Sequence, residues 1–405
     1  MIEVLTGDCI ELMRTLPERS VHTCVTSPPY FGLRNYGHDG QIGLEPTPDV
    51  YVARLVEVFR EVRRVLRDDG TLWLNLGDSY ASTAPGTKNA PQTKGSKVNA
   101  DQWANIRPDL RAHGLKPKDL IGIPWRVAFA LQADGWYLRQ DIIWHKPNPM
   151  PESVTDRCTK AHEYIFMLSK GPKYFFDAEA IKEPATWTRN NNPDWQKQRA
   201  ATNVKKGAGN RNAVDGGFTG WDSSKGRNRR SVWTVTTKPF KGAHFATFPP
   251  DLIEPCILAG APERCCSVCG AGFIRQVEKG EVDLEWQRRC GGDASGGYSG
   301  ESTKDYASAG AQDASATKRR ILEGMRPKIT VGWSPACGCN AVAAASRVLD
   351  PFGGSGTTGL VAAKHGRRAV LCELNPRYAD MARERVGLPT IGPTTAQLNE
   401  IEGLL

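Results

Sequence analysis

The stretch DPFGGSGTTG, residues 350–359, decides the fold of this chain. It follows the apolar run SRVL, which predicts a buried strand, and it opens a predicted helix from about Thr358 to His365. Glycines at positions 353, 354 and 356 permit positive φ and let a ligand approach the backbone closely. A strand, a glycine-rich turn and a helix in this order predict a ligand-binding unit of an α/β fold.

A carboxylate follows this turn at a spacing suited to ribose recognition. Glu373 lies near the end of the next predicted strand, in AVLCELN, about 20 residues beyond the turn, where a carboxylate can bind ribose hydroxyls. The turn and Glu373 together predict a nucleoside-containing cofactor. Because Gly354, Gly356 and Gly359 also satisfy the spacing G-x-G-x-x-G, a nicotinamide dinucleotide stays open at this point.

Strand and helix patterns alternate along the rest of the chain, which predicts a parallel sheet. The remaining strand candidates are IEVLTGD, VHTCVTS, TLWLNLGD, YLRQDIIWH, EYIFMLS and RRAVLCELN. A helix is expected from Val50 to Leu66, with its stop at Asp69-Gly70, and another in DLIGIPWRVAFALQADG. Residues 81–115 are expected to form a long mobile loop. Seven strand candidates thus fall into two blocks separated by an insert of mixed character.

Composition indicates a soluble globular protein that can bury a large core. The 405 residues are 40% hydrophobic and 24% charged, and no apolar stretch approaches the length of a membrane span. The N-terminal MIEVLTGDC lacks the features of a signal peptide. We therefore expect a cytoplasmic protein whose eleven cysteines are reduced thiols or metal ligands.

Positive charge is concentrated in one segment. The net charge is +9, and residues 186–232 hold ten Lys and Arg residues against three Asp residues. This excess predicts a polyanionic partner. Aromatic residues interleave with the charges, which is consistent with base stacking or with local packing: Trp187, Trp195, Phe218, Trp221 and Trp233.

The second strand candidate ends in TSPPYFG, residues 26–32, which combines a small hydroxyl residue, two prolines and an aromatic residue. Adjacent prolines stop the hydrogen-bond ladder of the strand and stiffen the turn. With DPFGGSGTTG and CELNPRY, this motif resembles the S-adenosylmethionine-dependent DNA amino-methyltransferases, whose catalytic motif is [DNS]-P-P-[YFW]. The motif order resembles the permuted β class. The resemblance implies a doubly wound, mostly parallel seven-stranded sheet of the Rossmann-like methyltransferase fold, circularly permuted, with an inserted target-recognition region.

The resemblance also implies the positions of the cofactor contacts. Gly7-Asp8 is expected against the adenine, Glu373 on the ribose, and Asp350 with HFATFPP (from His244) near the methionine end. The predicted cofactor-binding residues are Asp8, Phe248, Asp350, Pro351, Phe352, Gly353, Gly354, Ser355, Gly356, Thr357, Glu373 and Asn375.

The chemistry of a base amino group explains TSPPY. The amino nitrogen is a poor nucleophile because its lone pair is delocalised into the ring. The Ser27 hydroxyl and the Pro28 carbonyl can accept its two hydrogens and direct the lone pair at a methyl group. Pro29 stiffens the turn, Tyr30 offers a stacking face, and the target base must be flipped out of the duplex. The predicted catalytic residues are Ser27, Pro28, Pro29 and Tyr30.

Among the enzymes that this chain resembles, S-P-P-Y accompanies N4-cytosine methylation more often than N6-adenine methylation. We therefore expect site-specific methylation of cytosine N4 in double-stranded DNA, with N6-adenine as the alternative. A nicotinamide-dependent oxidoreductase is a more distant alternative, which leaves TSPPY, the basic segment and the cysteines unexplained. An inactive DNA-binding module and an RNA substrate also stay open.

Four cysteines have the spacing of a metal site. Cys266-x-x-Cys269-Gly has the pattern of a zinc knuckle, and Cys337-Gly-Cys339 supplies two more thiolates, with Cys265 and Cys290 as possible substitutes. We expect a structural zinc ion bound by Cys266, Cys269, Cys337 and Cys339. A deaminase-type catalytic zinc is not expected, since no His-x-Glu accompanies these cysteines.

The expected organisation has five parts. These are a catalytic half (1–185), a basic target-recognition insert (186–235), a cofactor-side segment (236–262), a zinc-knuckle insert (263–340, with 291–318 flexible) and a cofactor-binding half (341–405). The residues expected to bind DNA are Lys205, Lys206, Arg211, Arg227, Arg229 and Arg230. The recognised DNA sequence, the oligomeric state (a homodimer included) and any accompanying restriction enzyme cannot be read from the residues.

Overall fold

The computed structural model describes residues 1–36, 38, 40–81, 110–111, 114–184, 227–238, 247–280 and 328–390. The chain divides into two compact units. The first comprises Met1–Ile181, Arg230–Phe273 and Cys337–Leu405, and the second comprises Lys182–Arg229 and Ile274–Ala336. Among the described residues, no helix has the length and the apolar character needed to cross a membrane.

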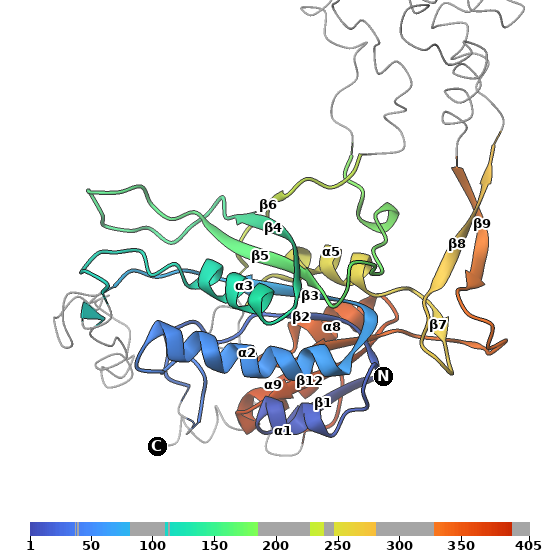
Figure 1. The fold of residues 1–405 in the computed structure, drawn as a ribbon, viewed down its shortest axis with the longest axis horizontal. Coiled ribbons are helices and arrows are strands. Elements are labelled where there is room, and N and C mark those ends of the chain that lie inside the picture. The colour runs from blue at the N-terminus through green and yellow to red at the C-terminus, as the bar shows by residue number, and fades with distance from the viewer. Residues whose placement is uncertain are drawn as a thin grey trace, which may run out of the picture. The chain divides into compact units, whose positions relative to one another are not determined.

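The first unit is built on a mostly parallel sheet, as the sequence predicts (Figure 1). Among the described strands of this sheet, only β5 runs antiparallel to its neighbours. Seven strands were expected, and the described sheet has an eighth, the short β6 at its edge. In spatial order the strands are β1 (Ile2–Thr6), β12 (Arg368–Glu373), β11 (Arg347–Asp350), β2 (Val21–Thr26), β3 (Leu66–Leu76), β5 (His162–Ser169), β4 (Tyr137–His145) and β6 (Val232–Thr234).

Helices cover both faces of this sheet, so the fold is doubly wound (Figure 1). One face packs against α1 (Cys9–Arg14), α2 (Pro48–Val65) and α3 (Ile123–Ala133). The other packs against α5 (Pro250–Gly260), α8 (Thr357–Lys364) and α9 (Pro376–Arg385). Side chains alternate along β3 as the strand period requires: Leu72 and Leu74 join the first core and Trp73 joins the second.

The pairing of β11 with β2 unites the two ends of the chain. These strands run parallel, with Val348 opposite Thr23 and Leu349 opposite Cys24. Because the carboxyl ends of parallel strands meet at one edge of a sheet, DPFGG and TSPPY emerge beside each other. A permuted chain order therefore yields a continuous sheet.

The predicted stop of the second helix at Asp69-Gly70 is wrong. Helix α2 ends at Val65, because Leu66 adopts an extended backbone and enters β3. Gly70 lies within β3, where a Cβ atom would approach the Arg67 carbonyl oxygen to 2.9 Å and the His22 carbonyl oxygen to 3.1 Å. The glycine thus permits close approach of two backbone segments and does not end the helix.

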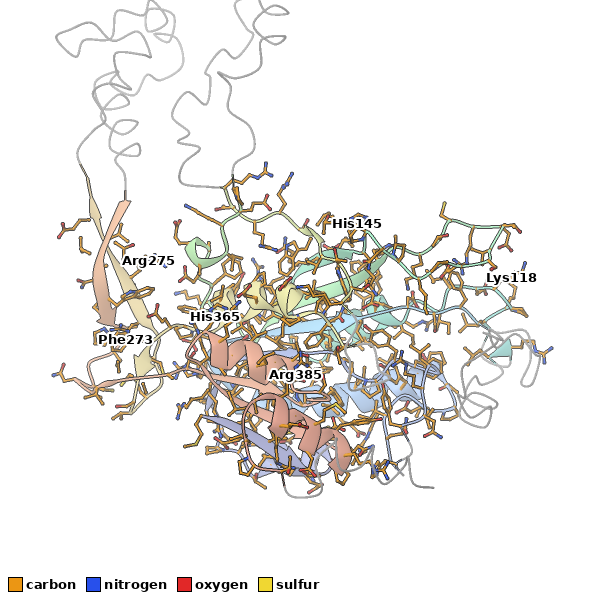
Figure 2. All side chains as sticks on the ribbon, turned by 180° about the vertical axis from the view of Figure 1, so that it is seen from behind. Lys118, His145, Phe273, Arg275, His365 and Arg385 are labelled. Atoms are coloured by element: carbon orange, nitrogen blue, oxygen red, sulfur yellow. The ribbon has the colours of Figure 1, made fainter. Side chains whose placement is uncertain are left out.

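Two small sheets were not predicted. In the first unit, β7 (Cys265–Cys266) pairs antiparallel with β10 (Ala343–Ala344). The other sheet joins β8 (Phe273–Lys279) and β9 (Lys328–Pro335). Within it the Arg275 guanidinium (labelled in Figure 2) lies 4.8 Å from the centroid of the Trp333 ring and donates to the Thr330 hydroxyl. This cation–π contact fastens one strand to the other.

A buried histidine connects three segments of the first unit. His22 of β2 is 5% exposed. Its Nδ1 accepts from the backbone N–H of Arg347 at 3.0 Å, and its Nε2 lies 2.9 Å from the Gly270 carbonyl oxygen, to which it must donate. The ring is therefore neutral. The pKa of His22 is lowered from 6.5 to about 4, chiefly by burial; nearby Arg67 and Arg368 also lower it, while Asp69 and the Gly270 carbonyl act in the opposite direction.

We expect His22 to make folding sensitive to acid. Its folded pKa lies below the unfolded value, so the unfolded chain takes up the proton first. The associated stability is present above pH 6.5 and is lost as the pH falls toward 4. Between pH 7 and pH 5 this amounts to about 2 kcal/mol, since one pKa unit corresponds to ~1.4 kcal/mol.

Urea unfolding of the wild type and His22→Gln at both pH values measures this contribution. The variant should be less stable than the wild type at pH 7, because it loses hydrogen bonds, and should lose less stability on acidification. Equal losses in the two proteins would contradict the assignment.

Candidate active site

A cavity of about 530 Å³ lies at the carboxyl edge of the sheet in the first unit. Its walls include residues that follow β1, β12, β11 and β2, together with residues at the nearby ends of β3, β4 and β5. This edge is where ligands bind in open α/β sheets. Of the predicted site residues, the cavity is lined by Asp8, Ser27, Pro28, Pro29, Tyr30, Phe248, Pro351, Phe352, Gly353, Gly354, Ser355, Thr357, Glu373 and Asn375.

Asp350 and Gly356, expected to contact the cofactor, do not line this cavity. The Asp350 carboxylate is buried and accepts hydrogen bonds from the hydroxyls of Thr26 and Thr358, each at 2.6 Å. It also accepts from the backbone N–H of Phe352 at 3.0 Å. Asp350 therefore fixes the conformation of the glycine turn from behind the turn, without lining the cavity. Burial raises the pKa of this carboxyl, and the three hydrogen bonds oppose that effect.

Gly356 has a similar structural role. It caps the N-terminus of α8 with φ of +77°, and a Cβ atom at this position would lie 3.0 Å from the Cβ of Ala382 in α9. Only glycine permits both the backbone conformation and the close helix contact. The Arg385 guanidinium (Figure 2) supports the same turn, since it donates to the hydroxyls of Ser355 and Thr357 at 2.9 Å.

Glu373 faces the cavity with its carboxylate held on both sides. One oxygen accepts from the backbone N–H of Gly354 at 2.8 Å, and the other accepts from the N–H of Asn375 at 2.9 Å. Each oxygen can accept more than one hydrogen bond, so the carboxylate can also serve a ligand. Burial raises the pKa of Glu373, and the backbone hydrogen bonds counteract this.

Asp8 is placed near Glu373 by backbone contacts. The N–H of Gly7 donates to the Glu373 carbonyl at 2.9 Å. The Asp8 carboxylate caps α1 by accepting from the N–H groups of Ile10 and Glu11 at 2.9 and 3.1 Å. The capping residue thus belongs both to the start of a helix and to the cavity wall.

The TSPPY segment is held rigidly from both sides. The Tyr51 hydroxyl of α2 donates to the Pro29 carbonyl at 2.8 Å, and the N–H of Gly32 donates to the Gly43 carbonyl at 2.8 Å. The Tyr30 hydroxyl donates to the Glu163 carboxylate at 2.7 Å. Burial raises the pKa of Tyr30 well above its ordinary value, and the adjacent Glu163 raises it further, so the phenol stays a donor.

Sequence reasoning missed the network around Glu163, at the start of β5. The Lys146 ammonium forms an ion pair with Glu163 and lies 4.2 Å from the centroid of the Trp144 ring. Asn75, at the end of β3, donates to Glu163 at 3.3 Å and to the Tyr164 carbonyl at 3.0 Å. Glu163, Lys146, Trp144 and Asn75 all line the cavity. The sequence carries a signal for this network, because Asn75, Lys146 and Glu163 are polar residues at the ends of three predicted strands.

The remaining predicted site residues that the structure describes do not line this cavity. The sulfur atoms of Cys266, Cys269, Cys337 and Cys339 lie within 4.8 Å of one another. Arg227 pairs with Glu183 at 2.8 Å within the second unit, whereas Arg230 belongs to the first unit; Arg229 belongs to the second. Three predicted DNA contacts, Lys205, Lys206 and Arg211, lie outside the described residues, as do residues 82–109 of the expected loop and all of 291–318.

The sequence profile of the family described as DNA methylase matches residues 21–265 and 343–384, which contain both motifs of the cavity. This chain belongs to the DNA methylase family. The match confirms the resemblance to the S-adenosylmethionine-dependent DNA amino-methyltransferases.

Two relatives also match most of this chain. Type II methyltransferase M.XycI of Xanthomonas campestris pv. cyanopsidis is 41% identical to this methylase over 380 residues, which cover 94% of this chain and 86% of that protein. M.SmaI of Serratia marcescens is 38% identical over 384 residues, covering 95% and 90%. A solved structure titled PvuII DNA methyltransferase (cytosine-N4-specific) aligns with 98% of this methylase and 90% of that chain, at 16% identity and a TM-score of 0.47.

We expect Gly77→Ala to reduce methyl transfer to DNA at least about tenfold while leaving the fold intact. A Cβ atom at position 77 would lie 2.5 Å from Cε2 of Tyr30, so the ring would have to leave its place beside Glu163. Loss of one positioned group at a catalytic site commonly costs about 10²-fold.

Initial rates with tritiated cofactor and thermal melting measure the two effects. Gly332→Ala is the matched control, because a Cβ atom there meets nothing within 4 Å. Equal rates in the Gly77→Ala and Gly332→Ala variants would show that the position of Tyr30 does not matter.

Proposed function

We propose that this DNA methylase transfers the methyl group of S-adenosylmethionine to the N4 amino group of a cytosine flipped out of duplex DNA at a specific site. The observation that carries the proposal is that Ser27 and Gly354 line one cavity, although more than 300 residues separate them in the chain. The cavity therefore has a nucleoside-binding wall and an amino-group-binding wall. Enzymes that act on a base must take it out of the stack.

The residues of one wall fit the cofactor. The Glu373 carboxylate, fixed by Gly354 and Asn375, is suited to accept from ribose hydroxyls. Asp8, which follows β1, offers a carboxylate to the adenine end of the cofactor. Phe248, which precedes α5, offers an aromatic ring to the methionine end. When bound, S-adenosylmethionine supplies an electrophilic methyl group on a positively charged sulfonium.

The opposite wall is suited to an exocyclic amino group. The Tyr51 hydroxyl holds the Pro29 carbonyl, and we assign the second acceptor to the Pro28 carbonyl beside the Ser27 hydroxyl. Two acceptors directed at the two amino hydrogens would orient the nitrogen lone pair. The stiff turn holds both in place before the base enters, and such preorganisation lowers the barrier.

Tyr30 and its neighbours orient the base. The hydrogen bond to Glu163 fixes the plane of the Tyr30 ring, which then offers a face for stacking. Lys146, which is held by Glu163 and lies over Trp144, carries three N–H donors. Cytosine presents two adjacent acceptors, O2 and N3, beside N4, and an ammonium donor at this wall complements them.

DNA is the partner that the family implies, and the charge of the chain supports it. Ten basic residues against three acidic ones in residues 186–232 favour phosphate binding. Within the described part of this segment, Arg227 is oriented by Glu183. We propose Lys205, Lys206, Arg211, Arg227, Arg229 and Arg230 as phosphate or base contacts.

We expect DNA treated with the protein and cofactor to yield N4-methylcytosine. Mass spectrometry of the digested nucleosides identifies the product; N6-methyladenine with no N4-methylcytosine would overturn the choice of cytosine. In the same assay Ser27→Ala should lower the rate at least about 10²-fold, because one acceptor is lost.

Cofactor affinity, measured by calorimetry, should change little in Ser27→Ala, since the Ser27 side chain lies on the base wall. Ser20→Ala is the control, because the Ser20 hydroxyl donates to the Pro17 carbonyl away from the cavity. An unimpaired rate in Ser27→Ala would remove TSPPY from the reaction.

DNA affinity is expected to fall steeply with salt. Six phosphate contacts would lower the affinity by about 10³-fold between about 50 and about 200 mM salt. Replacing Lys205 and Lys206 together by Gln should reduce the logarithmic salt slope by about two. Fluorescence anisotropy with a labelled duplex measures the slopes.

Lys364→Gln is the control for this experiment, since Lys364 pairs with Glu254 between α8 and α5. An affinity that does not depend on salt would rule out an interface dominated by phosphates.

A further inference from the structure

We infer that Cys266, Cys269, Cys337 and Cys339 bind one structural zinc ion, which fastens together the two points where the chain leaves and re-enters the first unit. Their four sulfur atoms lie within 4.8 Å of one another. In a tetrahedral zinc site with bonds of about 2.3 Å, ligand sulfurs are about 3.8 Å apart, so small side-chain movements complete the geometry.

The backbone around the cysteines is already arranged for a metal knuckle. The N–H of Gly270 donates to the Cys266 carbonyl at 2.9 Å, and Gly270 adopts φ of +71°, which closes a tight turn after β7. Pairing of Cys266 with Ala343, and the bond from the N–H of Ser267 to the Val342 carbonyl at 3.1 Å, brings the second arm alongside. Two separate segments thus present two thiols each.

The neighbouring cysteine is excluded from this cluster. The Cys265 thiol points to the carbonyl of Ala344, with the sulfur 3.3 Å from that oxygen, and Cys290 lies outside the described residues. Four thiolates favour zinc over magnesium or calcium, which prefer oxygen ligands. Because four protein ligands fill the tetrahedron, no position is left for a substrate, and the ion is structural.

The positions of the ligands along the chain explain what the ion does. The chain passes from the first unit to the second after Phe273 and returns at Cys337. Cys266 and Cys269 lie shortly before the departure, and Cys337 and Cys339 lie at the return. A zinc ion therefore closes the excursion of residues 274–336 at its base, which limits the loop entropy of that long insert.

The knuckle is also docked onto the strands that lead to the active site. The Arg67 guanidinium of β3 donates to the Cys269 carbonyl at 2.5 Å, and the His22 ring of β2 donates to the Gly270 carbonyl at 2.9 Å. Strand β2 continues directly into Ser27. The metal site and the base-binding wall are therefore connected through one strand of the central sheet.

Metal analysis of the purified full-length protein by plasma mass spectrometry tests the inference. We expect one zinc ion per chain in the wild type and loss of that zinc in Cys337→Ser and Cys339→Ser. Cys158→Ser, which changes an exposed cysteine outside the cluster, should keep its zinc. Metal-free wild type, iron in place of zinc, or unchanged zinc in both cluster variants would each overturn the assignment.

X-ray absorption at the zinc edge of the wild type keeps the test valid if the variants do not fold. Four sulfur ligands at about 2.3 Å are expected, and nitrogen or oxygen ligands would contradict the four-cysteine site. Neither measurement depends on methyl transfer. The zinc assignment can therefore be refuted while the proposed function stands, and the proposed function can be refuted while the zinc assignment stands.

Discussion

The parallel pairing of β11 with β2 is the constraint on which the rest of the structure depends. It is reinforced by one buried carboxylate, that of Asp350, which accepts hydrogen bonds from the hydroxyls of Thr26 at the end of β2 and Thr358 in α8. An uncompensated buried charge would be costly, so the two hydroxyls and the Phe352 N–H are needed to stabilise it. Through these bonds the two distant motifs are held side by side, and neither half of the chain could form the cavity alone.

The two walls of the cavity are each organised by a half-buried acid whose oxygens accept hydrogen bonds from specific donors. Glu373 fixes the Gly354 turn on one wall, and Glu163 fixes Tyr30 and Lys146 on the wall where we propose that the base binds. Rigid placement of this kind reduces the rearrangement that a ligand must impose. The geometry is therefore present before substrate binds.

Much of this arrangement could be predicted from local pattern, and what could not depends on contacts between distant residues. Strand alternation and the two motifs predicted the parallel sheet and most of the named site residues, although other residues also line the cavity. The spacing of Cys266 and Cys269 indicated a clustered site. Local sequence does not determine which way the Asp350 side chain points, so the sequence predicts a cofactor contact where the structure has a carboxylate bound to Thr26 and Thr358. Glu163 has no motif and meets Tyr30 only through the β3–β5 pairing. The predicted end of α2 at Asp69-Gly70 is wrong because Gly70 lies in β3, where it permits two backbone segments to approach closely.

Two acids beside the glycine turn, Glu373 on the cavity wall and Asp350 behind the turn, also bear on the charge of the proposed ligand. Burial raises the pKa of both Asp350 and Glu373, and the negative charge of Asp350 adds to the effect on Glu373. Keeping two such groups beside one turn is unfavourable in a chain without a ligand, and backbone and hydroxyl donors offset only part of the cost. A cofactor that bears a positive sulfonium would relieve this repulsion, whereas a dinucleotide, with its negatively charged pyrophosphate, would increase it. The electrostatics of the wall thus favour S-adenosylmethionine over the nicotinamide alternative that the glycine spacing alone left open.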